Sequence, residues 1–294
     1  MGRRRYRRLL VGPDAYRWRV GHQHTRDGRR LLDCRETLLL RQEGRPGRIN
    51  VVFREGPGRI VPDGGPYTHS GSVCRAEDET MLNLHRPRVV RALLDVALGR
   101  GEDFWSSAEI DGWTIIDAVY AHLAGKSRHL VQHDYGMGGL WWWVWADSAE
   151  EILDACAEVE GMDDPDVIRR VRSWGDMEEV VLDRLAPDSA LAHLRDQRSS
   201  YRDDPGYGEL AGHDVVHLRI PDEEDERVAW LTEFGRDGRW TRQVEIRPGE
   251  HPVRSSADDW PINPPLDLYD PRYLPYRISA AEFENAWEKA RPEQ

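Results

Sequence analysis

Four side chains near the N-terminus belong to the residue types that bind zinc or support nucleophilic catalysis: His22, His24, Cys34 and Glu36. Zinc takes imidazole, thiolate and carboxylate ligands, and a cysteine beside a histidine is a nucleophile. The sequence therefore raises the hypothesis of a metal-binding protein or an enzyme with a zinc or Cys/His centre. Neither His-x-His nor Cys-x-Glu is a specific signature, and histidine and free cysteine also serve as core residues. Our leading expectation is a protein without a cofactor.

A β-hairpin is the element that would bring these four side chains together. Residues 16–24 alternate in polarity with a period of two, and residues 32–38 predict a second strand. The intervening Arg26-Asp27-Gly28 is typical of a three-residue loop whose glycine is left-handed. This loop sets the register, so the four side chains share one face of the hairpin. The opposite face is expected to meet solvent and carries four arginines: Arg17, Arg19, Arg29 and Arg35.

The N-terminal segment is rich in arginine. Residues 1–54 contain 15 arginines and 5 acidic residues, and five of these arginines lie within residues 3–8. Arginine contacts with phosphates supply sequence-independent affinity for nucleic acid, so we keep nucleic-acid binding by this segment as an alternative. Two observations disfavour it. The whole chain has a net charge of -12, and no helix-turn-helix, zinc-finger or RNA-recognition motif is present.

Negative charge is concentrated in the second half of the chain. Residues 1–125 carry a net charge of +5, and residues 126–294 carry -17. Such a surface attracts cationic partners and repels nucleic acid. A loop between residues 255 and 276 supplies the acidic and aromatic candidates for contact with a basic protein: Asp258, Asp259, Trp260, Asp267 and Tyr269. Loops held on a rigid scaffold commonly carry binding residues.

The segment Leu140-Trp141-Trp142-Trp143-Val144-Trp145-Ala146 contains no charge and no helix breaker. This pattern predicts a strand that is buried on both faces. Each tryptophan can bury about 200 Å² of surface. We therefore expect the strand to form the centre of a core, because apolar residues on both sides leave no face for stacking a ligand.

The whole pattern predicts an α+β protein in two parts. Residues 1–125 are expected to form a basic, β-hairpin-rich domain with one helix over 87–98, while the element over 113–123 is ambiguous. Residues 126–294 are expected to form an acidic, mixed α+β domain centred on the Trp-rich strand. Its last helix is predicted to follow Ser279, the first residue of a capping box.

Composition limits the class of protein further. The chain has 294 residues, of which 39% are hydrophobic and 32% are charged. No apolar run is long enough to cross a bilayer, and three widely spaced cysteines do not form a disulfide framework. We therefore expect a cytoplasmic protein without a membrane partner.

The C-terminal quarter carries Pro261-Ile262-Asn263-Pro264-Pro265 and, further on, Ile278-Ser279-Ala280-Ala281-Glu282-Phe283-Glu284-Asn285-Ala286-Trp287. It resembles a small uncharacterised bacterial domain that ends in an I-S-x-x-E-F-x-x-x-W helix, and some members of that group look like immunity proteins of toxin–immunity loci. The whole chain also resembles uncharacterised actinobacterial proteins. The likeness implies no catalytic residue. We expect a non-catalytic interaction protein of the immunity type, whose acidic surface binds a basic protein partner.

Overall fold

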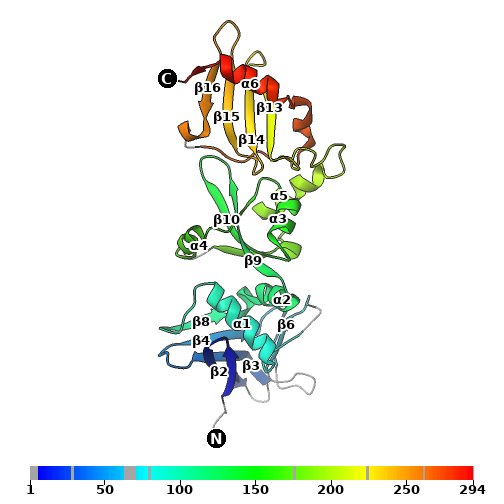
Figure 1. Cartoon of the computed structure of the whole chain (residues 1–294). Helices are drawn as coiled ribbons and strands as arrows, with labels where there is room; N and C mark the ends of the chain where they lie inside the picture. Colours follow the sequence, from blue (N-terminus) through cyan, green and yellow to red (C-terminus); the bar gives the residue numbers. More distant parts are fainter. Residues whose placement is uncertain are drawn as a thin grey trace. The chain divides into compact units, whose positions relative to one another are not determined.

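The computed structural model describes residues 6–27, 30–62, 71–78, 81–174, 177–222, 225–260 and 262–293. The chain has an α+β fold, with a β-rich N-terminal region, and divides into two compact units (Figure 1). The first comprises Met1–Arg128, Arg169–Gly175 and Glu179–Val181, and the second comprises the other residues. No single cut in the sequence produces this division, because two short segments between residues 169 and 181 belong to the first unit.

The first unit is built on a five-stranded sheet in the order β1-β2-β3-β4-β8. Its strands are β1 (Arg7–Val11), β2 (Asp14–Asp27), β3 (Arg30–Gln42), β4 (Arg48–Arg54) and β8 (Ser107–Asp111). β1 to β4 are antiparallel, and β8 runs parallel to β4. A smaller sheet contains β5 (Arg59–Ile60), β6 (Ser72–Arg75) and β7 (Leu82–Asn83).

The predicted register of the β2–β3 hairpin is confirmed along most of its length. Trp18 pairs with Leu40, and His22 pairs with Glu36. The register shifts between Gln23 and Thr25, because β3 contains a bulge in which Asp33 and Cys34 lie opposite one residue of β2. The predicted three-residue loop is wrong, since Arg26 and Asp27 belong to β2 and pair with Leu31 and Arg30, while Gly28 and Arg29 lie outside the described residues. Tyr16, Trp18, Leu38 and Leu40 are buried on one face, as the alternation predicts.

Two α-helices belong to the first unit, α1 (Pro87–Gly99) and α2 (Ile116–Ala124), with a 3₁₀ turn η1 (Gly112–Thr114) before the second. The prediction of α1 is confirmed, but the prediction of a single helix is wrong. The ambiguous segment forms α2, which buries Ile116 and Val119 and ends at the left-handed Gly125. Spacing of three residues between buried side chains is that of a helix face, so this element packs as a helix.

The second unit contains the Trp-rich strand, β10 (Gly139–Ala146). It lies next to β9 (Ser127–Asp134), which in turn pairs with β11 (Glu160–Met162). Burial on both faces is confirmed from Trp142 to Ala146, whereas Leu140 is exposed. The accompanying elements are α3 (Ala149–Ala155), η2 (Leu182–Arg184) and α5 (Ala190–Ser200). Two further elements, α4 (Pro165–Arg172) and β12 (Glu178–Val181), each have residues in both units.

The C-terminal part of the second unit is a five-stranded sheet in the order β13-β14-β15-β16-β17. Its elements are β13 (Val215–Pro221), β14 (Ala229–Gly235), β15 (Trp240–Ile246), β16 (Val253–Ser256), η3 (Ala257–Asp259), η4 (Pro271–Tyr276), α6 (Ala280–Lys289) and β17 (Arg291–Pro292). The predicted cap of α6 is confirmed, since Ser279 Oγ accepts from the Glu282 amide at 3.1 Å.

An ion-pair cluster connects α6 to this sheet. Arg242 Nε donates to Glu233 Oε1 at 2.9 Å, and Arg242 Nη2 donates to Glu284 Oε1 of α6 at 2.6 Å. His217 Nε2 lies 3.1 Å from Glu233 Oε2. Hydrogen bonds from Arg242 lower the pKa of Glu233 from its ordinary 4.5 to about 2.

We expect Glu233→Gln to make the free energy of unfolding less dependent on pH in the acidic range. The folded-state pKa is depressed, so the ionised carboxylate stabilises the fold above about pH 4.5 and this contribution is lost as the pH falls toward 2. After allowance for solvent screening, we expect about 1–2 kcal/mol of pH-dependent free energy to disappear in the variant. Urea unfolding at a series of pH values measures it. Exposed Glu288→Gln on α6 is the control, and parallel curves for wild type and Glu233→Gln would contradict the prediction.

Candidate functional site

The structure brings together only part of the predicted zinc or Cys/His centre. His22 Nδ1 lies 3.0 Å from Oε1 of the fully buried Glu36. The rings of His22 and His24 are 5.1 Å apart, but His24 is exposed, as are its neighbours at the end of β2. Cys34 is fully buried. Across the described ranges, no group of three or more His, Cys, Asp and Glu side chains is placed to hold a metal ion.

The five loop residues predicted to contact a partner fall into two groups. Asp258 and Trp260 are exposed, and the indole Nε1 of Trp260 donates to Glu293 Oε2 at 3.3 Å. Asp259 is the last residue of η3. Asp267 and Tyr269 lie further along the loop, where Asp267 is only 7% exposed and Tyr269 is half-buried. The loop packs onto the unit as expected, and this packing removes Asp267 from the binding surface.

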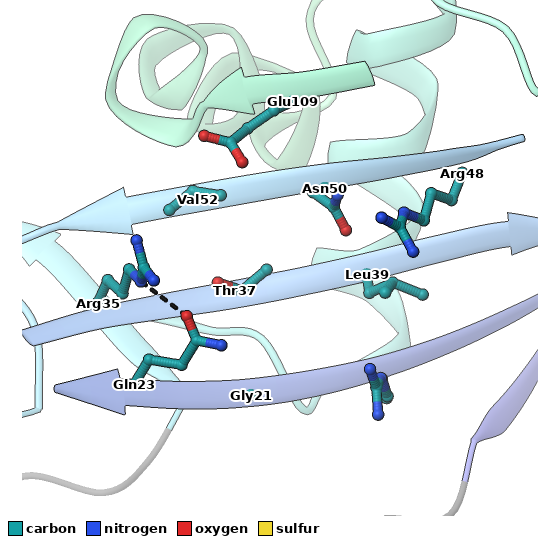
Figure 2. A pocket seen from close by; sticks show the side chains of 10 residues that line it. Gly21, Gln23, Arg35, Thr37, Leu39, Arg48, Asn50, Val52 and Glu109 are labelled. Carbon is teal, nitrogen blue, oxygen red and sulfur yellow. Dashed lines mark hydrogen bonds between the residues drawn. The ribbon is translucent and has the colours of Figure 1, made fainter. Parts of the chain in front are cut away.

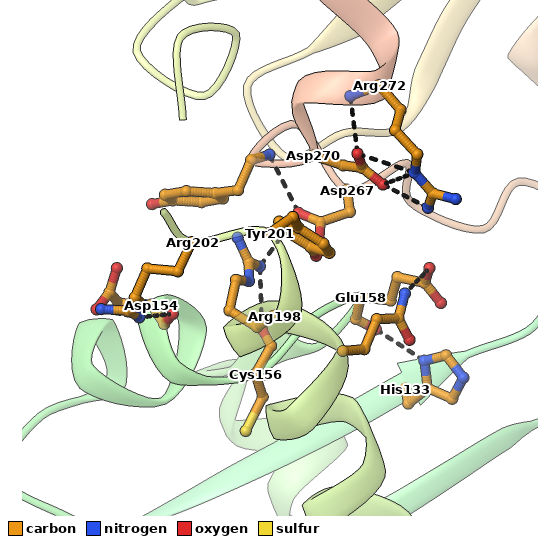
Figure 3. A network of polar contacts seen from close by, with 12 residues as sticks. His133, Asp154, Cys156, Glu158, Arg198, Tyr201, Arg202, Asp267, Asp270 and Arg272 are labelled. Carbon is orange, nitrogen blue, oxygen red and sulfur yellow. Dashed lines mark hydrogen bonds and ion pairs between the residues drawn. The ribbon is translucent and has the colours of Figure 1, made fainter. Parts of the chain in front are cut away.

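Asp267 belongs to a buried polar network, which Figure 3 shows. Arg198 Nη2, from α5, lies 3.1 Å from Asp267 Oδ1 and donates to the Cys156 carbonyl at 3.0 Å. The guanidinium of Arg198 lies over the Tyr269 ring, 4.2 Å from its centroid, and the Tyr201 hydroxyl donates to Asp267 Oδ2. A charge removed from water must be paired, and Asp267 supplies the opposite charge for the buried Arg198.

The electrostatics of the network indicate a structural role. Burial raises the pKa of Asp267, while the Tyr201 hydroxyl and the Arg198 guanidinium oppose the rise. Burial also raises the pKa of Tyr201. A cavity of about 410 Å³ adjoins the network, but Nε and Nη1 of Arg198 are closed to solvent and have no acceptor among the described residues. A ligand in the cavity therefore has no access to these two nitrogens.

An exposed apolar surface lies at the turn between β9 and β10 and on the loop beside it. Five large side chains there are between 41% and 88% exposed: Tyr135, Met137, Leu140, Trp260 and Ile262. We call them the hairpin-tip patch. The turn and the loop are in contact, because a Cβ atom at Gly136 would lie only 2.9 Å from the Ile262 side chain. Contiguous exposed apolar side chains on a folded protein mark interaction surfaces, where methionine and aromatic residues are enriched.

Polar contacts hold the two parts of the hairpin-tip patch in place. Arg239 Nη2 lies 2.5 Å from Glu160 Oε1 and 3.3 Å from Asp134 Oδ2, and Nη1 donates to the Asn263 carbonyl. The Asn263 side chain bonds the Trp240 amide at 3.2 Å and the Trp240 carbonyl at 2.8 Å. Burial alone would lower the pKa of Arg239, but the two carboxylates raise it. The guanidinium thus remains charged and connects the hairpin to the loop.

Sequence reasoning did not find most of the hairpin-tip patch. One local signal was available, because Tyr135 and Met137 alternate with glycines in the turn, where polar residues are usual. The left-handed Gly136 confirms the turn. No local signal identifies Ile262, since its contact with Gly136 joins segments that are far apart in the sequence.

None of the helices in the described segments is long and apolar enough to span a bilayer. Comparisons of the chain with family models, with curated proteins and with solved structures gave no significant match.

Proposed function

We propose that this chain is a non-catalytic binding protein of the immunity type, which binds a basic protein partner through the hairpin-tip patch. The observation that supports the proposal is the exposure of Met137, Tyr135 and Ile262 on a turn and a loop that Arg239 holds together. Such an arrangement presents apolar side chains at low entropic cost, because the backbone beneath them is already ordered.

The charge around the hairpin-tip patch favours a basic partner. Residues 126–294 carry a net charge of -17, and Asp258 is exposed two residues before Trp260. Interfaces combine an apolar centre with a polar rim, and charge complementarity between rims accelerates association and selects partners. The C-terminal resemblance to immunity-like domains agrees with a partner of this kind.

Truncating the patch tests the proposal. Tyr135→Ala combined with Met137→Ala is expected to weaken binding of a basic partner at least about tenfold, because exposed anchors of this type dominate interface energies. The partner is first captured from the native host at low salt with the full chain. It is then purified and titrated calorimetrically with wild type and variant.

The matched control is Tyr276→Ala with Met81→Ala, which removes the same two residue types from exposed positions elsewhere. The control is expected to bind within about twofold of wild type. Capture of no basic protein at low salt, or equal weakening by the control, would overturn the proposal.

A further inference from the structure

The outer face of the first unit's sheet is covered with arginine. Seven arginines of its described strands lie on the face opposite Tyr16 and Trp18: Arg8, Arg17, Arg19, Arg35, Arg41, Arg48 and Arg54. The register places several of them side by side, as in the Arg17–Arg41 and Arg35–Arg54 pairs. Like charges opposite one another destabilise a sheet. Folding stability therefore does not explain why so many arginines lie on this face.

The centre of this arginine face is hollow, as Figure 2 shows. Gly21 lies opposite Thr37 in the register, and these small residues leave a cavity of about 480 Å³ between longer side chains. Its polar lining includes Arg19, Arg35 and Arg48, together with the amides of Gln23 and Asn50. One carboxylate, Glu109, also lines the cavity and pairs with Arg54. The three arginines of the lining therefore outnumber the single carboxylate around a set of uncharged hydrogen-bonding groups.

Ion pairs among the described residues neutralise fewer than half of these arginines. Glu43 pairs with Arg8 and Arg17, and Glu109 pairs with Arg54. Arg35 Nε donates to the amide oxygen of Gln23 at 2.7 Å, which orients the guanidinium and leaves its charge uncompensated. In the segments that the structure describes, no carboxylate pairs with four of the arginines: Arg19, Arg35, Arg41 and Arg48.

An aromatic side chain extends the arginine face at one end. Trp105 is exposed and lies two residues before Ser107, which is opposite Arg48 in the register. The guanidinium of Arg45 stacks over the Trp105 ring, 3.9 Å from its centroid. Exposed aromatic and guanidinium planes are the surfaces on which unpaired bases stack.

We propose that the arginine face binds single-stranded nucleic acid. Strands about 4.8 Å apart, with same-face side chains about 7 Å apart along each strand, spread the arginines over several phosphates rather than one. The arginines would hold the backbone, while Gln23 and Asn50 would meet sugar or base groups. This site lies within the arginine-rich residues 1–54 considered from the sequence, and it assigns the binding to arginines on one face of the sheet. It is also independent of the hairpin-tip patch, since it lies in the other unit.

Fluorescence anisotropy on the full chain tests the site with labelled RNA and DNA single strands of about 15 nucleotides. The variant Arg19→Gln/Arg35→Gln/Arg48→Gln is expected to bind roughly tenfold or more weakly. The slope of log affinity against log salt should fall by about 2, because each phosphate contact on a single strand contributes about 0.7. The charge-matched control Arg86→Gln/Arg219→Gln/Arg291→Gln, drawn from exposed positions elsewhere, should bind within about twofold of wild type.

Two further variants keep the test decisive. Thr37→Asp places one negative charge in the hollow and is expected to weaken binding even if the triple variant fails to fold. Removing residues 1–5 should change affinity less than about twofold, because the seven arginines of the proposed face all remain. Any one of four results would overturn the proposal. The control could weaken binding as much as the triple variant, or binding could be lost when residues 1–5 are removed. The chain could bind duplex DNA or an acidic protein more tightly than single strands, or show no salt-dependent binding of single strands.

Discussion

Replacing Arg198 with methionine is expected to lower the free energy of unfolding of the second unit by about 3–5 kcal/mol. The variant leaves the Asp267 carboxylate buried without its cation, and Asp267 keeps only the bonds from the Tyr201 hydroxyl and the Tyr269 amide. It also removes the guanidinium from the Tyr269 ring. Methionine retains the volume of the side-chain stem, so the loss reports the missing charge rather than a cavity.

A double-mutant cycle separates charge pairing from packing. Asp267→Asn in the Arg198→Met background removes the uncompensated charge, and we expect it to recover at least about half of the lost stability. Urea unfolding with hydrogen exchange in β14 and β15 follows the second unit specifically. The control pair is Arg202 with Asp154, whose side chains are 44% and 53% exposed. Breaking this surface pair should cost less than about 1 kcal/mol. Equal losses at the two sites would contradict the structural role given to the Arg198–Asp267 network.

Phe283→Ala is expected to destabilise the C-terminal sheet by about 3–5 kcal/mol. Phe283 is fully buried and forms one core with Leu231 and Val244, beneath α6. Its ring also lies 4.8 Å from the ring of His217, and the Arg242 guanidinium stacks over it at 5.0 Å. The substitution therefore opens a cavity and weakens the ion-pair cluster that connects α6 to the sheet.

Hydrogen exchange of the β14 and β15 amides measures this loss, because opening of the sheet exposes them. Exposed Asn285→Ala in the same helix is expected to change stability by less than about 0.5 kcal/mol. A cost below about 1 kcal/mol for Phe283→Ala would show that α6 is not needed to cover the sheet. The hydrophobic core of this part of the chain would then have to be elsewhere.

The arginine face could be predicted from the sequence only in part. Alternation in residues 16–24 predicted that Arg17 and Arg19 lie on a polar face, because side chains on a strand alternate with a period of two. The predicted hairpin also placed Arg35 on this face. It did not predict that β1 and β4 would add Arg8, Arg48 and Arg54, since strand neighbours and their registers come from tertiary pairing. The net charge of -12 obscured this face, because opposite charges are concentrated in different parts of the chain.

The sequence by itself determined the elements that depend on local pattern. The period-two strands, the burial of Trp142 to Ala146 and the Ser279 cap of α6 follow from neighbouring residues, and the structure contains them. Only the tertiary structure decided which functional groups are available. His24 lies at the exposed end of the β2–β3 hairpin, Asp267 is buried in an ion pair with Arg198, and contact with Gly136 places Ile262 in an exposed patch. Each outcome depends on contacts between residues that are distant in the sequence. A local sequence pattern cannot predict these contacts, because it carries no information about tertiary packing.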